Sequence, residues 1–263
     1  MGINFNTSQE ELEIRAAKAV AANNALRQKI RNELVLNKPP EGIMAGLYKK
    51  IPTNMRLLGE NLVGVDRPIT NKDFTNDELV EMAFLVQKQR EANAKREKFF
   101  REQQQFDVYP EQKDKTEKRL QSFENTRGKT SVDPYRTIGN EPIVSGRKVD
   151  KGYFDSIISS FTDPRYGVAT TLGKYNVQQT PEMDVIKDTY NFNKAERNLP
   201  SNPIQALQRM VISPEIAGEY LANILGTKDR PVNIELKRKF ANGGGVFNYY
   251  DTLNQGIGAY NGY

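Results

Sequence analysis

Two long helices are the strongest structural prediction from this sequence, because each begins with the same start signal. Ser8 and Glu11 form one Ser/Thr-x-x-Glu capping box, and Thr75 and Glu78 form another. Such a box supplies hydrogen-bond partners to backbone groups that the first turn of a helix leaves unpaired. Apolar residues recur at helical spacing after both boxes. We therefore predict one helix over residues 8–36 and a second helix from Thr75 onward.

The first helix carries an apolar seam with the spacing of a coiled coil. The seam residues alternate between spacings of four and three: Leu12, Ala16, Ala19, Asn23, Leu26 and Ile30. In a coiled coil, a polar seam residue such as Asn23 can fix the register or the number of chains. The seam spans fewer than four heptads, so an ordinary amphipathic helix that packs on its own domain fits equally well.

The second helix loses its apolar face along its length. The stripe at its start consists of Leu79, Met82, Ala83 and Val86. Charged residues dominate after residue 90, and aromatic residues then stand among them: Phe99, Phe100, Phe106 and Tyr109. A helix of this kind projects into solvent or packs on another chain. We favour a protein interface for these aromatic residues, although stacking on single-stranded nucleic acid fits the same composition.

The rest of the chain predicts a small β element among shorter helices. Tyr109-Pro110 ends the second helix, and a weaker helix follows over residues 111–126. A turn is expected at 163–167. Further helices are expected at 151–161, about 203–212 and 214–226, and strands at 168–177, 183–190 and 231–236. A lone hairpin is marginal in water, so these strands must pack on helices or gain strands from a partner.

The carboxyl-terminal segment from Phe240 is rich in Gly, Asn and Tyr and poor in aliphatic residues. Its aromatic residues are candidate interface residues: Phe247, Tyr249, Tyr250 and Tyr260. Tyrosine combined with glycine and asparagine suits an adaptable protein-binding tail. We expect this tail to become ordered only against a partner.

These patterns together predict an α+β protein that is mainly α. The predicted regions are an elongated helical region (1–126), an extended connector (127–150), a hairpin-plus-helix domain (151–239) and a partner-ordered tail (240–263). Hydrophobic residues make up 37% of the chain, below the usual globular share. We therefore expect the extended segments to bury their apolar faces only against partners.

The residue types that are missing exclude several kinds of chemistry. The chain has no Cys and no His, which rules out disulfides, thiol nucleophiles, Ser-His-Asp triads and the usual zinc sites. No apolar run approaches the roughly 20 residues that span a bilayer. The net charge of +5 arises from 38 basic and 33 acidic groups of mixed position, which favours a solvated charged surface over a nucleic-acid site. We predict no catalytic residue, no metal ligand and no cofactor.

One acidic group on a predicted strand keeps a carboxylate-only hydrolase open. Glu182, Asp184 and Asp188 lie close in sequence, and the two aspartates share a face of an unbroken strand. Two carboxylates at suitable separation can hydrolyse a glycosidic bond. We favour the simpler interpretation of a solvated hairpin edge on which Asp188 caps a turn.

Two stretches resemble motifs of virion-associated proteins of tailed bacteriophages. Residues 67–79 (RPITNKDFTNDEL), after Leu58-Gly59, resemble a G-x-x-x-P-I-T-x-x-D-F/L-T/S-x-x-E-L lead into a helix. Residues 172–176 (LGKYN) and 185–193 (VIKDTYNFN) resemble an L-G-x-Y/F … V-x-D-T-Y-D-F-N hairpin, with Asn191 in place of the expected Asp. The resemblance implies a place in a virus particle and contact with the cell envelope during DNA delivery. It implies no activity.

The function expected from these observations is a non-enzymatic structural or assembly component of a phage particle, in a core, connector, tail or DNA-ejection role. Its expected partners are other virion proteins and further copies of itself in a symmetric assembly, with DNA or the cell envelope as further contacts. The protein would be made in the host cytoplasm and end in the virion. The alternatives are a virion-associated peptidoglycan hydrolase and a DNA-binding packaging protein.

Overall fold

The structure, a computed structural model, describes eight stretches of the chain. They are residues 9–38, 51–106, 109–126, 128–136, 159–160, 162–180, 183–190 and 229–239. The α-helices in them are Gln9–Glu33 (α1), Thr53–Leu62 (α3), Asn76–Gln104 (α4), Pro110–Asn125 (α5) and Pro164–Leu172 (α8), with a 3-10 turn at Asn71–Asp73 (η1). The strands are Ile69–Thr70 (β1), Lys129–Val132 (β2), Tyr175–Gln179 (β3), Met183–Tyr190 (β4) and Arg230–Lys237 (β5). A mainly helical chain with a small mixed sheet confirms the predicted α+β class.

The five strands form one sheet in the order β1-β5-β4-β3-β2. Strand β1 runs parallel to β5, and the other neighbouring pairs are antiparallel. Val177 of β3 lies opposite Ile186 of β4, which lies opposite Ile234 of β5. All three side chains are buried, so they form one apolar row across the sheet. The predicted hairpin therefore gains its additional strands from its own chain.

The sequence interpretation of residues 163–177 was wrong in its first half. A turn at 163–167 and a strand at 168–177 were expected, but residues 164–172 form helix α8 and the strand begins at Tyr175. Asp163 caps the helix by accepting a hydrogen bond from the Arg165 backbone N–H, and Pro164 stands at its first position. Proline there is pre-organised for a helix, and this local signal outweighs the β-branched residues that follow.

The core lies between one face of the sheet and the first turns of α4. Leu79, Met82, Phe84 and Val86 of α4 belong to the same buried cluster as the strand residues. Because α4 is buried all round from residue 78 to residue 86, it is the central helix of the molecule. Helix α8 contacts α4 as well, and α3 contacts α8.

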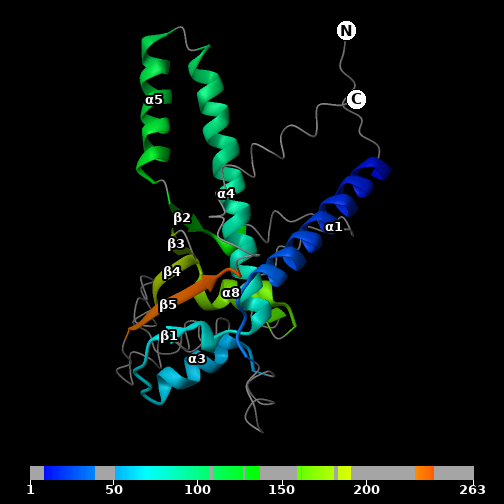
Figure 1. Cartoon of the computed structure of the whole chain (residues 1–263), viewed down its shortest axis with the longest axis vertical. Coiled ribbons are helices and arrows are strands. Elements are labelled where there is room, and N and C mark those ends of the chain that lie inside the picture. Colours follow the sequence, from blue (N-terminus) through cyan, green and yellow to red (C-terminus); the bar gives the residue numbers. More distant parts are fainter. Residues whose placement is uncertain are drawn as a thin grey trace, which may run out of the picture.

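Two helical arms leave this core in different directions (Figure 1). The outer part of α4 and the antiparallel α5 form one arm, the hairpin arm. The amino-terminal half of α1 forms the other, and its carboxyl-terminal half is fastened to the core. There Arg27 binds Glu81 at 2.7 and 3.0 Å, and its guanidinium lies 3.8 Å from the centre of the Phe84 ring. After α1, Leu34 forms a β-bridge with Arg238 at the end of β5.

The sheet draws its strands from three of the four predicted regions of the chain. Strand β1 belongs to region 1–126, β2 to the predicted connector 127–150, and the other strands to region 151–239. The region boundaries stay a prediction. The expected helices at about 203–212 and 214–226, most of the helix at 151–161, the rest of the connector and the tail from residue 240 lie outside the described residues.

Candidate functional site

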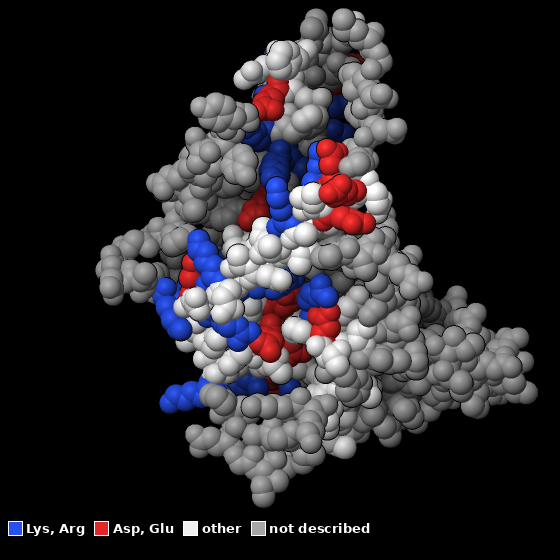
Figure 2. Space-filling view, turned by 90° about the vertical axis from the view of Figure 1, so that its right-hand side faces the viewer, with Lys and Arg blue, Asp and Glu red and all other residues white. Residues whose placement is uncertain are grey.

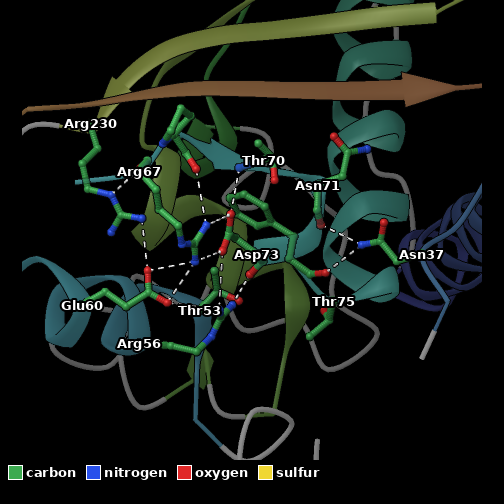
Figure 3. Close-up of polar contacts among 12 residues, drawn as sticks. Asn37, Thr53, Arg56, Glu60, Arg67, Thr70, Asn71, Asp73, Thr75 and Arg230 are labelled. Atoms are coloured by element: carbon green, nitrogen blue, oxygen red, sulfur yellow. Dashed lines mark hydrogen bonds and ion pairs between the residues drawn. The ribbon is translucent and has the colours of Figure 1, made fainter. Parts of the chain in front are cut away.

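A charged network joins β1 and η1 to α3 and β5 (Figure 3). Asp73 is buried, and its carboxylate accepts hydrogen bonds from Arg67 at 2.9 and 2.5 Å and from the Thr70 backbone N–H at 2.8 Å. Burial alone would raise the pKa of Asp73. The hydrogen bonds and the nearby Arg56 guanidinium outweigh burial and hold the pKa below its ordinary value. Asp73 is therefore an ionised anchor for the segment that leads into α4.

Strand β5 enters this network through Arg230, whose side chain is fully buried. Its Nε donates to the Arg67 carbonyl at 2.9 Å, and its Nη2 donates to Glu60 of α3 at 3.1 Å. Glu60 also accepts from Arg67 at 3.0 Å and lies 3.8 Å from Arg56. Both carboxylates of the network, Asp73 and Glu60, are thus bound by arginine side chains. Such pairing is typical of a structural role, here the attachment of α3, β1 and β5 to one another.

Glu78 caps helix α4, and it joins helix α3 to α4 through a hydrogen bond from Thr53. Its Oε2 accepts hydrogen bonds from the Thr75 backbone N–H and from the Thr53 hydroxyl, both at 2.8 Å. Burial raises the pKa of Glu78, and these hydrogen bonds oppose that effect only in part. On the other side lies Gly167 of α8, where a Cβ would stand 2.6 Å from Glu78 Oε1. The predicted capping box is confirmed, and the close approach of α8 is an addition to it.

The acidic group of β4 is not a solvated hairpin edge, so that interpretation was wrong. Strand β4 lies between β3 and β5, and Asp184 is buried on the side that faces α4. Arg90 of α4 donates to both of its carboxylate oxygens, at 3.0 and 2.6 Å. Asp188 accepts from the Thr189 N–H at 2.8 Å, and partial burial raises its pKa. Glu182 lies outside the described residues.

The hairpin arm places the four predicted aromatic residues in two environments. Phe100 packs against Phe123 of α5 with ring centres 6.1 Å apart, and Arg119 lies 5.0 Å from the centre of its ring. In contrast, Phe99 is 53% exposed, and Phe106 and Tyr109 at the tip of the arm are 79% and 68% exposed. Exposed aromatic side chains of this size are typical of contact surfaces for other macromolecules.

The predicted seam of α1 divides in the same way. Ile30 is buried and Leu26 packs against the core, as expected for an amphipathic helix on its own domain. Asn23, Ala19 and Ala16 are half-buried, and Leu12 near the free end is 50% exposed. A coiled coil with another chain stays a prediction for this outer end.

The charges on the described surface are mixed rather than segregated. Figure 2 shows Lys and Arg interspersed with Asp and Glu on the face that it presents. No group of three or more potential ligands among the described residues could hold a metal ion, and none of their helices is long and apolar enough to cross a bilayer. Phe247, Tyr249, Tyr250 and Tyr260 lie outside the described residues.

The comparisons with known proteins give no relative for this chain. No protein family, no curated protein and no solved structure matches it.

Sequence reasoning missed the buried charged residues. Asp73, Arg90 and Arg230 are buried, and the residues that pair with charged groups around the core also include the partly buried Arg27, Arg56 and Glu60 and the exposed Arg67. Two signals were present: Thr70 and Asp73 repeat the capping-box spacing, and Arg230 alternates in phase with Val232, Ile234 and Leu236 at core-facing positions. The partners of Arg27, Arg90 and Arg230 come from distant segments, so no local pattern identifies them.

Proposed function

We propose that this protein is a non-enzymatic structural component of a larger assembly, and that its helical arms contact neighbouring subunits. The setting that we propose is the particle of a tailed bacteriophage, because residues 67–79, 172–176 and 185–193 resemble segments of virion-associated proteins. The protein would be made in the host cytoplasm and incorporated into the virion.

The observation that carries the proposal is the position of the exposed apolar residues relative to the core. Among the described residues, the buried apolar cluster lies at the sheet and the first part of α4, whereas Leu12, Phe99, Phe106 and Tyr109 lie on the arms outside it and are exposed. Removing such side chains from water stabilises an interface by about 25 cal/mol for each Å² buried. Exposed apolar residues on arms outside the core are available for contact with neighbouring subunits.

The charged side chains of the core support the same proposal over the hydrolase alternative. A glycosidase needs one carboxyl to act as an acid and a second to act as a base or nucleophile. Asp184 is instead held by both nitrogens of the Arg90 fork, and Asp73 is held by Arg67. Carboxylates that are bound to arginine in this way join structural elements and are not free to act as an acid or a base.

Particle incorporation tests the proposal directly. Phage particles are purified on a density gradient, washed at high salt and analysed by quantitative mass spectrometry. We expect the chain at a constant copy number per particle. A variant with Phe99→Ser and Phe106→Ser, supplied in place of the wild type, should be incorporated several-fold less. A Lys129→Glu, Lys187→Glu variant is the surface control, because both lysines are exposed and belong to strands β2 and β4 rather than to the arm helices.

Two outcomes would contradict the proposal. One is a chain that is absent from washed particles. The other is lysis of cell walls by the purified protein in a zymogram, lost on Asp188→Asn. That substitution is preferred to a change at Asp184 because it leaves the ion pair with Arg90 intact.

A further inference from the structure

The hairpin arm has two flanks, and the contacts between α4 and α5 identify them. Phe100 of α4 packs on Phe123 of α5. Successive residues of a helix are rotated by about 100°, so Phe99 and Arg101, which precede and follow Phe100, lie on opposite flanks. Arg101 lies 3.6 Å from Glu124, the residue that follows Phe123. We call the flank that carries Phe99 the aromatic flank.

The same reasoning places the charged residues of α5. Because the two helices are antiparallel, a residue that precedes an interface residue lies on the aromatic flank in either helix, as the pairing of the two following residues shows. Thr116 and Leu120 of α5 are buried against α4. Lys115 and Arg119 precede them and therefore lie on the aromatic flank, whereas Glu117 lies on the other flank.

Charge is distributed unequally between the two flanks. The basic residues of the aromatic flank are exposed and form no ion pair within the described part of the chain: Lys95, Arg96, Lys115 and Arg119. Two acidic residues stand at its margin, of which Glu102 is paired with Lys98 at 3.8 Å and Glu111 lies at the start of α5. The other flank carries more acidic than basic residues: Glu97, Glu117 and Glu124 against Arg101 and Lys113.

A seam with the spacing of a helix–helix contact runs along the aromatic flank. Its residues alternate between spacings of four and three: Ala92, Arg96, Phe99, Gln103 and Phe106. Phe99 is 53% exposed and Phe106 is 79% exposed. The Phe106 N–H bonds to the Gln103 carbonyl at 2.8 Å, so the helical path continues to Phe106. A second helix receives side chains at this spacing, so the seam offers α4 and α5 a third helix.

We propose that the aromatic flank binds an acidic amphipathic helix of another protein in the assembly. The apolar side of that helix would cover Phe99 and Phe106, and its carboxylates would pair with the four basic residues of the flank. Complementary charge of this kind selects a partner and speeds its association. This inference rests on the proposed function and names the class of partner that the hairpin arm takes.

The described helices of this chain do not supply such a partner. In α1, Glu10, Glu11 and Glu13 are followed by the exposed Arg15 and Lys18. In α5, lysines alternate with the acidic residues over positions 111–118. A described helix from a second copy would therefore place like charges against the aromatic flank, which costs binding energy.

A nucleic acid fits the aromatic flank less well than a helix does. Every nucleotide carries a phosphate charge. The acidic residues of the other flank lie about one helix diameter away, roughly 10 Å, which is within the range of electrostatic repulsion at moderate salt. A helix can carry its carboxylates only on the side that faces the basic residues, so it avoids this repulsion.

Two synthetic helical peptides test the class of partner against the full-length chain. Both have the same seam of leucines, and the positions beside the seam are Glu in one peptide and Lys in the other. We expect fluorescence anisotropy to show binding of the acidic peptide and none of the basic peptide. A single-stranded oligothymidylate is the third probe, and it should bind more weakly than the acidic peptide.

Charge reversals on the two sides of the arm locate the binding surface. Lys95→Glu combined with Lys115→Glu should weaken binding of the acidic peptide by roughly tenfold, because two complementary charges become repulsive. Lys113→Glu combined with Lys118→Glu is the charge-matched control, since both lysines are exposed on the arm but away from the aromatic flank. Circular dichroism checks that each variant keeps its fold. Equal losses in the two variants, no binding of the acidic peptide, or tighter binding of the oligothymidylate would overturn the inference.

Photo-cross-linking in the particle separates this inference from the proposed function. Benzoylphenylalanine replaces Phe99, and we expect an adduct with an acidic helical segment of a different protein. In particles that contain the chain, an adduct with DNA or with a second copy, or no adduct, disproves the inference and leaves the assembly function standing. A chain that binds the acidic peptide but is absent from washed particles disproves the particle function and keeps the specificity of the flank.

Discussion

Buried charged side chains join segments of this chain that are distant in sequence. Asp73, Asp184 and Arg230 come from η1, β4 and β5, and each is paired with an arginine or a glutamate from another segment. A buried charge without a partner costs several kcal/mol, so these pairs fix which segments meet even where their net contribution to stability is small. Removing one partner of such a pair should therefore lower the free energy of unfolding.

Substitution of Arg230 by Met should lower the free energy of unfolding by about 3 kcal/mol, because the Glu60 carboxylate and the Arg67 carbonyl both lose a buried partner. Urea denaturation followed by circular dichroism measures the change. Lys237→Met in the same strand is the control, since Lys237 is exposed and should change stability by less than about 0.5 kcal/mol. Equal effects of the two substitutions would contradict the structural role of Arg230.

Two buried carboxyls should respond to acid in opposite directions. The folded-state pKa of Asp73 is lowered, so its contribution is complete above the ordinary pKa of 3.8 and is lost as the pH falls below that value. The folded-state pKa of Glu78 is raised, so its ionised form opposes folding above that pKa, and acid relieves this cost.

Urea midpoints between about pH 3 and pH 7 test these signs. Asp73→Asn should flatten the fall in stability at the acidic end. Glu78→Gln should steepen the fall, because it removes the contribution that grows on acidification. Identical pH profiles for the two variants would show that the environments of the two carboxyls are not as described.

At the scale of elements, helix α8 approaches the start of α4 so closely that a Cβ on Gly167 would stand 2.6 Å from Glu78 Oε1. Glu78 is fixed by Thr53 and Thr75 on one side, so its carboxylate cannot retreat freely from Gly167 on the other. This explains why a glycine stands in the middle of α8, where alanine would form a better helix.

Two glycine-to-alanine substitutions should therefore have opposite signs. Gly167→Ala should destabilise the protein by about 1–3 kcal/mol, because the new methyl group displaces the Glu78 carboxylate. Gly59→Ala in α3 has nothing within 4 Å of the new group and should be neutral or stabilising by up to about 1 kcal/mol. Thermal unfolding of both variants measures the difference. Stabilisation by Gly167→Ala would refute the close approach of the two helices.

At the scale of the whole molecule, the stable part and the contact-making parts are separate. The apolar cluster joins the sheet to residues 79–86 of α4 and to the carboxyl-terminal end of α1. On α5, only Thr116 and Leu120 are buried. Local stability follows the density of such buried contacts, so the arms should open more easily than the core.

Hydrogen–deuterium exchange by mass spectrometry should show this division. Backbone amides in residues 79–90 and in β4 should exchange at least roughly tenfold more slowly than amides in residues 95–104 and in α5. The slow set should disappear only when the protein unfolds globally. Similar protection of both sets in the unassociated chain would argue that the arms belong to the cooperative core.

The sequence by itself determined the local elements of this protein. The capping box at Thr75 started α4 because its two hydrogen bonds form within four residues, and the alternation of Val232, Ile234 and Leu236 placed strand β5. A signal of the same kind was missed at Asp163-Pro164. There a capping residue is followed by a proline in the first turn, and this combination favours helix α8. The exposed Phe99, Phe106 and Tyr109 were also visible as aromatic residues in a polar helix.

Only the tertiary structure decided which segments meet. The parallel pairing of β1 with β5 and the ion pair of Arg90 with Asp184 join residues more than 90 positions apart, and their energies depend on burial that the whole fold creates. The division of the α1 seam into a docked half and a free half has the same origin, because one repeating pattern runs through both halves. A local pattern records what a residue can do with its near neighbours, whereas burial and pairing depend on the positions of all the others.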